Sequence, residues 1–87
     1  MSNAVKKNLN RPMVLHVDYI GTNDWGVWPR RFDAQAPTIS DKPKWRGTNP
    51  LMLLSAAKNE LMALNIPHTI HWSEAATILT ENSTIKL

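Results

Sequence analysis

The sequence contains no cysteine among its 87 residues and only three glycines. Without thiols the chain forms no disulfide, zinc ribbon or iron–sulfur cluster, and it has no cysteine nucleophile. Three glycines are too few for a loop that cradles nucleotide phosphates, and neither a P-loop nor a G-x-G-x-x-G motif occurs. The G-x-S-x-G pattern of many serine hydrolases is also missing. We therefore predict no catalytic residues, no resident metal and no cofactor.

Long apolar runs are absent as well. No run approaches the roughly 20 residues of a membrane span, and residues 1–11 lack the apolar segment of a secretory signal. We therefore expect a cytoplasmic chain without a membrane partner. Hydrophobic residues make up 43% and charged residues 20% of the sequence, a composition typical of a folded protein. The length predicts one domain, residues 12–87, preceded by a mobile basic tail, residues 1–11.

The net charge of +3 is unevenly spread along the chain. Residues 1–11 carry three cations and no acid, and residues 28–46 carry five cations and two acids. Two basic blocks in a nearly neutral remainder favour an anionic partner, most commonly nucleic acid. The alternative is that a basic tail and a basic loop only keep a small protein soluble.

An antiparallel hairpin is predicted near the start of the chain. Residues 13–20 alternate apolar with polar side chains, as a strand with one buried face does. Turn-forming residues 21–24 precede residues 25–28, which resume a strand pattern. Pro29 has no N–H, so it ends the pairing, marks a bulge or places this strand at a sheet edge. The residues expected to face the core are Leu15, Val17 and Tyr19.

Residues 33–48 show no periodicity, and long loops of this kind tend to be functional or disordered. Asn49 and Pro50 then begin a helix over residues 51–64. Asn65 is predicted to adopt the left-handed conformation that ends helices. A third strand, residues 68–72, and a second helix capped by Ser73 follow. The first helix is expected to bury Leu53, Leu54, Ala57, Leu61 and Leu64, and to leave a second stripe of Met52, Ala56 and Ala63.

This order of elements, ββαβα, predicts a small α+β fold. Its simplest form is a three-stranded sheet, made of the N-terminal hairpin and the third strand, with both helices on one face.

One segment combines aromatic and cationic side chains. Bases stack on aromatic rings, and Lys and Arg neutralise phosphates. For Trp25 and Trp28 we favour packing in the core or hairpin, whereas Trp45 either anchors the loop or contacts a partner. The residues predicted to bind nucleic acid are Arg30, Arg31, Lys42, Lys44, Trp45 and Arg46.

Four polar residues raise the question of a metal-dependent site: His16, Asp18, His68 and His71. If the third strand pairs near the first, several of them converge. His68 and His71 are three apart, however, so they face opposite sides of a strand. A small hydrolase or nuclease that uses His16, Asp18 and a second histidine is therefore only a third hypothesis.

The leading hypothesis is a small non-enzymatic accessory protein, of the kind that mobile elements encode, which binds DNA or RNA through the basic aromatic segment. The alternative is a protein-interaction module, such as an inhibitor or regulatory subunit. It would bind another protein, or a second copy of itself, through the long loop, a sheet edge or the methionine-bearing helix face.

Overall fold

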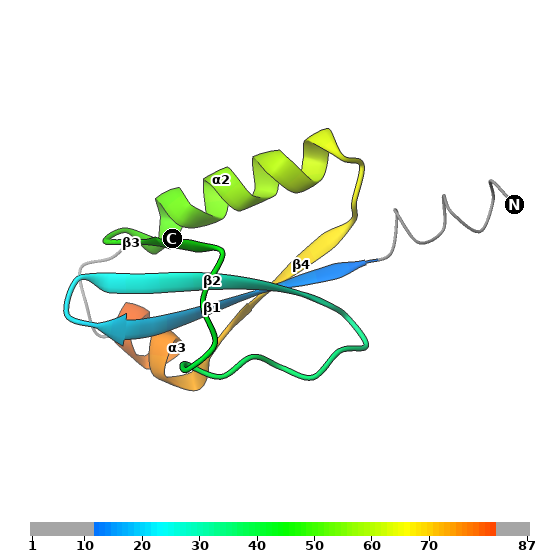
Figure 1. The fold of residues 1–87 in the computed structure, drawn as a ribbon. Helices are drawn as coiled ribbons and strands as arrows, with labels where there is room; N and C mark the ends of the chain where they lie inside the picture. The colour runs from blue at the N-terminus through cyan, green and yellow to red at the C-terminus, as the bar shows by residue number, and fades with distance from the viewer. Residues whose placement is uncertain (1–11, 82–87) are drawn as a thin grey trace, which may run out of the picture.

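A computed structural model of the chain describes residues 12–81. The predicted basic tail, residues 1–11, and the last residues, 82–87, lie outside this part. The elements, labelled as in Figure 1, are β1 (Met13–Gly21), β2 (Asp24–Arg31), β3 (Trp45–Gly47), α2 (Pro50–Ala63), β4 (His68–Trp72) and α3 (Glu74–Glu81). The fold is α+β, as predicted.

Within residues 12–81 the sheet has four strands in the order β3-β2-β1-β4, so the predicted three-stranded sheet is corrected. β1 pairs antiparallel with β2 and parallel with β4. The additional strand, β3, pairs antiparallel with residues 25–27 of β2. It forms because the chain returns along the free edge of β2, where Trp45 comes opposite Val27.

Pro29 lies within β2, opposite Leu15 of β1, and does not end the pairing. The N–H of Phe32 donates to the carbonyl oxygen of Pro12 at 3.2 Å. Because antiparallel bonds recur at every second residue, the N–H groups of β2 that face β1 belong to even-numbered residues. The nitrogen of Pro29 therefore points toward the β3 side of β2. Because β3 pairs only with residues 25–27, the missing N–H of Pro29 removes no hydrogen bond from the sheet.

Both ends of α2 follow the prediction. The Asn49 side chain accepts hydrogen bonds from the N–H groups of Leu51 at 2.9 Å and Met52 at 3.4 Å. Asn65 has a φ of 58°, and the N–H of Ile66 donates to the carbonyl oxygen of Leu61 at 2.9 Å. This pattern stops a helix cleanly, and it places β4 directly after α2.

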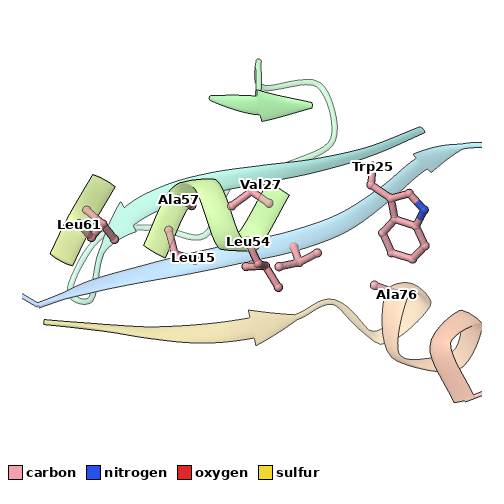
Figure 2. Packing of buried hydrophobic residues seen from close by; sticks show 8 residues of the cluster. Leu15, Trp25, Val27, Leu54, Ala57, Leu61 and Ala76 are labelled. Carbon is pink, nitrogen blue, oxygen red and sulfur yellow. The ribbon is translucent and has the colours of Figure 1, made fainter. Parts of the chain in front are cut away.

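The apolar core lies on the face of the sheet that carries Leu15 and Val17, here called the core face (Figure 2). α2 packs along this face, mainly over β2 and β3. α3 packs against β1 and brings Ala76 beneath the indole of Trp25. Both helices contact one apolar cluster. In Figure 1, however, α2 lies above the strands and α3 lies below the end of β1, so the predicted packing of both helices on one face is confirmed only in part. The buried cluster contains Leu15, Val17, Trp25, Val27, Leu54, Ala57, Leu61 and Ala76.

One member of the predicted helix stripe is wrong: Leu64 is 58% exposed, because α2 ends at Ala63 and the chain turns away. Met52, from the predicted second stripe, is exposed, and so is Met62. None of the helices within residues 12–81 is long and apolar enough to cross a membrane.

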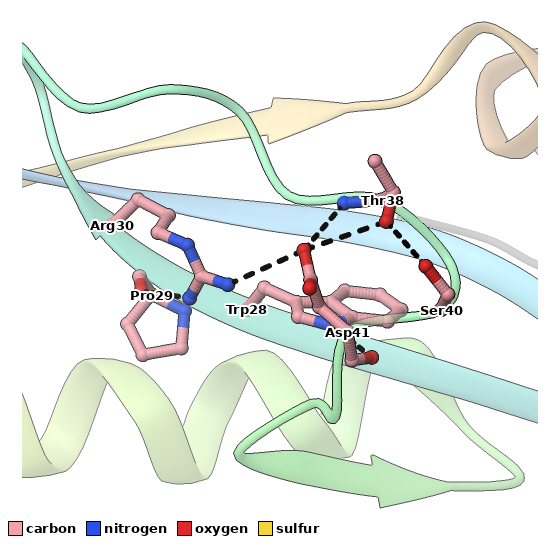
Figure 3. A network of polar contacts seen from close by, with 6 residues as sticks. All are labelled: Trp28, Pro29, Arg30, Thr38, Ser40 and Asp41. Carbon is pink, nitrogen blue, oxygen red and sulfur yellow. Dashed lines mark hydrogen bonds and ion pairs between the residues drawn. The ribbon is translucent and has the colours of Figure 1, made fainter.

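The opposite face, here called the outer face, carries Gly26 and Trp28 and is covered by residues 32–44, here called the connector (Figure 1). Trp28 is 1% exposed, and its Nε1–H donates to the carbonyl oxygen of Asp41 at 2.8 Å (Figure 3). A Cβ on Gly26 would lie 2.8 Å from the Trp28 ring and 3.0 Å from Pro43. Trp25 and Trp28 are three residues apart and thus fill opposite faces of the strand.

Candidate interaction site

Four of the five cations predicted to bind nucleic acid form ion pairs with carboxylates of the same chain. Arg46 donates to both carboxylate oxygens of Asp24, at 3.0 and 2.7 Å. This hydrogen bond, with the charge of Arg46, lowers the pKa of Asp24. Lys44 Nζ lies 2.5 Å from Oε2 of Glu60 on α2. Both pairs join residues far apart in the sequence, and both neutralise a cation of the basic segment.

Two further pairs involve the end of β2. Arg30 lies 3.7 Å from the Asp41 carboxylate and donates to the backbone oxygen of Pro29 at 2.9 Å (Figure 3). Arg31 lies 3.5 Å from Asp33. Of the five predicted cations, Lys42 forms no ion pair with any residue from 12 to 81.

The six predicted site residues do not gather on one face. Arg30 and Arg46 occupy outer-face positions of β2 and β3. Trp45 comes opposite Val27 on the core face and packs, half-buried, against the core. The Lys44 amine lies 4.9 Å from the Trp45 ring centroid and reaches α2. Trp45 therefore anchors the chain after the connector, and nucleic-acid binding by these residues stays a prediction.

The formal charge of residues 12–81 also differs from that of the whole chain. Residues 12–81 hold six Lys or Arg against seven Asp or Glu, a formal charge of −1. The positive charge of the full sequence thus comes from residues 1–11 and 82–87. Long-range attraction of a polyanion to the described part of the chain is correspondingly weak.

Polar groups beneath the connector line a small pocket of about 110 Å³ on the outer face. His16 and His71 meet edge to face there, with ring centroids 5.4 Å apart. Burial lowers the pKa of His16, and the nearby His71 and Arg30 lower it further. His68 pairs with Met13 and points to the other face, as its spacing predicts.

Asp18 takes part in the start of α3. The Ser73 hydroxyl donates to Asp18 Oδ1 at 2.5 Å and accepts from the N–H of Ala76 at 3.0 Å. The same carboxylate oxygen accepts from the N–H of Tyr19 at 2.7 Å. Asp18 is thus engaged in capping, and within residues 12–81 no three His, Asp or Glu side chains are grouped to hold a metal ion.

A hollow with a volume of about 460 Å³ lies on the core face, between α2 and β4. It exists because α2 packs mainly over β2 and β3 and leaves the neighbouring face of β4 uncovered. We call it the α2–β4 groove. Its lining residues are Leu51, Leu54, Ser55, Lys58, Asn59, Met62, Ile70 and Trp72.

Exposed apolar side chains border this groove. Met62 is 64% exposed and Ile70 is 37% exposed. Lys58 is the one charged residue of the lining, and it has no ion pair in the described part of the chain. The α2 residues that line the groove include positions 51, 55, 58 and 62, which lie on one side of the helix. Sequence patterns do not reveal this side, because Ser55 and Lys58 interrupt its apolar residues.

The floor of the groove continues into an open sheet edge. β4 is an outermost strand of the described sheet. The N–H of Met13 donates to the oxygen of Pro67, and the N–H of Ser73 donates to the oxygen of Val17, both at 3.0 Å. These bonds lie at the two ends of a parallel ladder. Within it, the backbone N–H and C=O groups of Thr69 and His71 point toward β1. The backbone groups of His68, Ile70 and Trp72 therefore point away from the sheet.

Comparisons of this chain with models of protein families, with curated proteins and with solved structures find no match.

Proposed function

We propose that this protein is a non-enzymatic interaction module that binds a protein partner along β4 and the α2–β4 groove. One observation carries the proposal: the open edge and the apolar groove are continuous, because Ile70 and Trp72 contribute to both. A partner that reaches the edge can satisfy exposed backbone groups and bury apolar surface in the same contact.

The two edges of the sheet differ in how well they are protected. β3 is three residues long, and its Arg46 is held by Asp24. β4 is longer and contains no Lys, Arg, Asp or Glu, no proline and no bulge. Natural proteins normally protect an edge strand by one of these devices. Their absence from β4 supports a role for this edge in binding.

The nucleic-acid hypothesis remains a separate prediction. It is supported by the basic residues of segments 1–11 and 82–87 and by Lys42. The other basic residues of the proposed patch are ion-paired. It predicts oligonucleotide binding that falls steeply with salt and weakens when Arg30 and Arg31 are both replaced by alanine.

Peptides selected from a random display library against the wild-type protein test the proposal. Ile70→Lys places a charge where the sheet edge meets the groove. The affinity of the selected peptides, measured by calorimetry, should fall roughly tenfold or more. Ile39→Lys is the matched control, because Ile39 is 54% exposed on the connector. Equal binding to wild type and Ile70→Lys, or a library that yields no binder, would refute the proposal.

A further inference from the structure

We infer that the segment bound at this surface is an extended strand that adds to β4 and carries an acidic side chain opposite Lys58. This inference rests on the proposed function and specifies the partner's chemistry. Three features lead to it: the direction of the β4 backbone groups, the position of the groove, and the charge of its lining.

The first feature is the direction of the backbone groups of β4. The alternation of the β1–β4 ladder leaves the N–H and C=O groups of His68, Ile70 and Trp72 directed outward. An extended peptide can bond to all of these groups, whereas a helix satisfies its own backbone internally and leaves them unpaired. An incoming strand therefore uses a feature of β4 that a docked helix does not.

The groove then receives alternate side chains of the added strand. Successive side chains of a strand point to opposite faces of a sheet. Ile70 and Trp72 both line the groove, so the core face of β4 opens into it. Every second side chain of an added strand therefore points to this same face, beside Ile70 and along the open side of the groove. Apolar residues at those positions would cover Ile70 and Met62.

Charge distinguishes among the possible strands. The groove lining contains Lys58 and no carboxylate. Lys44, also near α2, is already paired with Glu60, but Lys58 has no such partner within residues 12–81. A strand that brings a carboxylate beside its apolar side chains therefore supplies what the lining lacks.

The segments on either side of residues 12–81 do not match this charge requirement. Residues 1–11 and 82–87 contain Lys or Arg and no Asp or Glu. A second copy paired through β4 also brings no acid on that strand, whose sequence is His-Thr-Ile-His-Trp.

Geometry gives a second reason against a second copy. In such a dimer, β2 of one copy would lie five strand spacings from β2 of the other, roughly 24 Å. Packed helices lie about 8–10 Å apart. Because α2 packs mainly over β2 and β3, the two α2 helices would stay apart and the groove would remain open.

The test uses short synthetic peptides in which Thr alternates with Val, with Glu, Gln or Lys at one groove-facing position. The Glu peptide should bind about two- to fivefold more tightly than the Gln peptide, the range of an exposed ion pair. Lys58→Glu should reverse the preference to the Lys peptide. Lys42→Glu changes a connector lysine that has no ion pair within residues 12–81; it is the matched control and should not reverse the preference.

Amide hydrogen exchange of the free and peptide-bound protein tests the strand geometry. The N–H groups of Ile70 and Trp72 should become protected on binding, while those of Thr69 and His71 are protected in both states because they face β1. Protection confined to α2 would overturn strand addition. A light-scattering mass of two chains without peptide would overturn the choice of occupant.

The two proposals fail in different ways. Peptide binding that depends on Ile70 but is indifferent to the Lys58→Glu change would overturn the acidic partner and leave the interaction module standing. No binding by any peptide, with Ile70→Lys indistinguishable from wild type, would overturn both.

Discussion

The Nε1–H of Trp28 donates a 2.8 Å hydrogen bond to the carbonyl oxygen of Asp41, thirteen residues later in the chain. Asp41 also accepts from the N–H of Thr38 at 2.8 Å and lies 3.7 Å from Arg30 (Figure 3). These contacts tie the connector to the outer face. A loop without periodicity in its sequence is thus ordered by one buried indole and one carboxylate.

Replacing Trp28 tests this attachment. Trp28→Phe keeps a ring but removes the donor and part of the buried volume, so the free energy of unfolding should fall by about 1–3 kcal/mol. Denaturant unfolding measures the change, and exchange of the Asp41 amide should accelerate because the connector loosens. Phe32→Leu, at a side chain that is 61% exposed, should change stability by less than about 0.5 kcal/mol. Identical unfolding of Trp28→Phe and wild type would contradict this account.

A methyl group at Gly26 should disturb the same packing. The Cβ of alanine would lie 2.8 Å from Cη2 of Trp28 and 3.0 Å from Ile20. Gly26→Ala should therefore destabilise the protein by about 1–3 kcal/mol. Gly21→Ala is the matched control, because no atom lies within 4 Å of the added Cβ, and thermal melts should show little change. A larger loss at position 21 than at 26 would argue against close packing under the indole.

Acid should weaken the fold through His16. Its pKa is lowered in the folded state by burial, His71 and Arg30, while Asp41 partly offsets the charge of Arg30. As the pH falls below the ordinary value of 6.5, the unfolded chain takes up this proton before the folded chain does. Stability contributed by neutral His16 is present above that pH and is lost below it.

His16→Gln should therefore flatten the dependence of the unfolding free energy on pH in this range. His68→Gln, on the opposite face, should retain the contribution of His16. Parallel pH profiles for wild type and His16→Gln would show that His16 does not couple to folding.

The N-cap of α2 offers a test of helix stability. Asn49→Ala removes the acceptor for two backbone N–H groups and should cost about 1 kcal/mol. Asn59→Ala, at an exposed position inside the same helix, should be neutral or slightly stabilising because alanine favours helices. Chemical denaturation of the two variants distinguishes capping from a general loss of asparagine.

Much of the fold could be predicted because its signals are local. Alternation predicts β1, capping residues mark both ends of α2, and Ser73 marks the start of α3. β3 could not be predicted in this way, since three residues carry no periodicity and their pairing depends on the free edge of β2. In the hairpin turn, Asn23 rather than Gly21 adopts the positive φ, and the pairing register shifts between Tyr19 and Gly21.

The candidate site was less predictable, because it depends on contacts between distant residues. Asp24 and Arg46 are 22 positions apart, and Lys44 and Glu60 are 16 apart. No local pattern shows that these charges cancel. The groove likewise arises from where α2 crosses the sheet, and its lining mixes apolar residues with Ser55 and Lys58 in a stripe that does not appear amphipathic.

The shortness of β3 has a consequence for stoichiometry. A sheet with two usable edges can grow from both sides and link molecules into chains. Here the β3 edge is only three residues long, and its Arg46 is paired with Asp24. A strand that joins β4 therefore leaves no second edge for further strands to join. Titrations should therefore saturate at one partner per molecule, and concentrated mixtures should give discrete complexes instead of filaments.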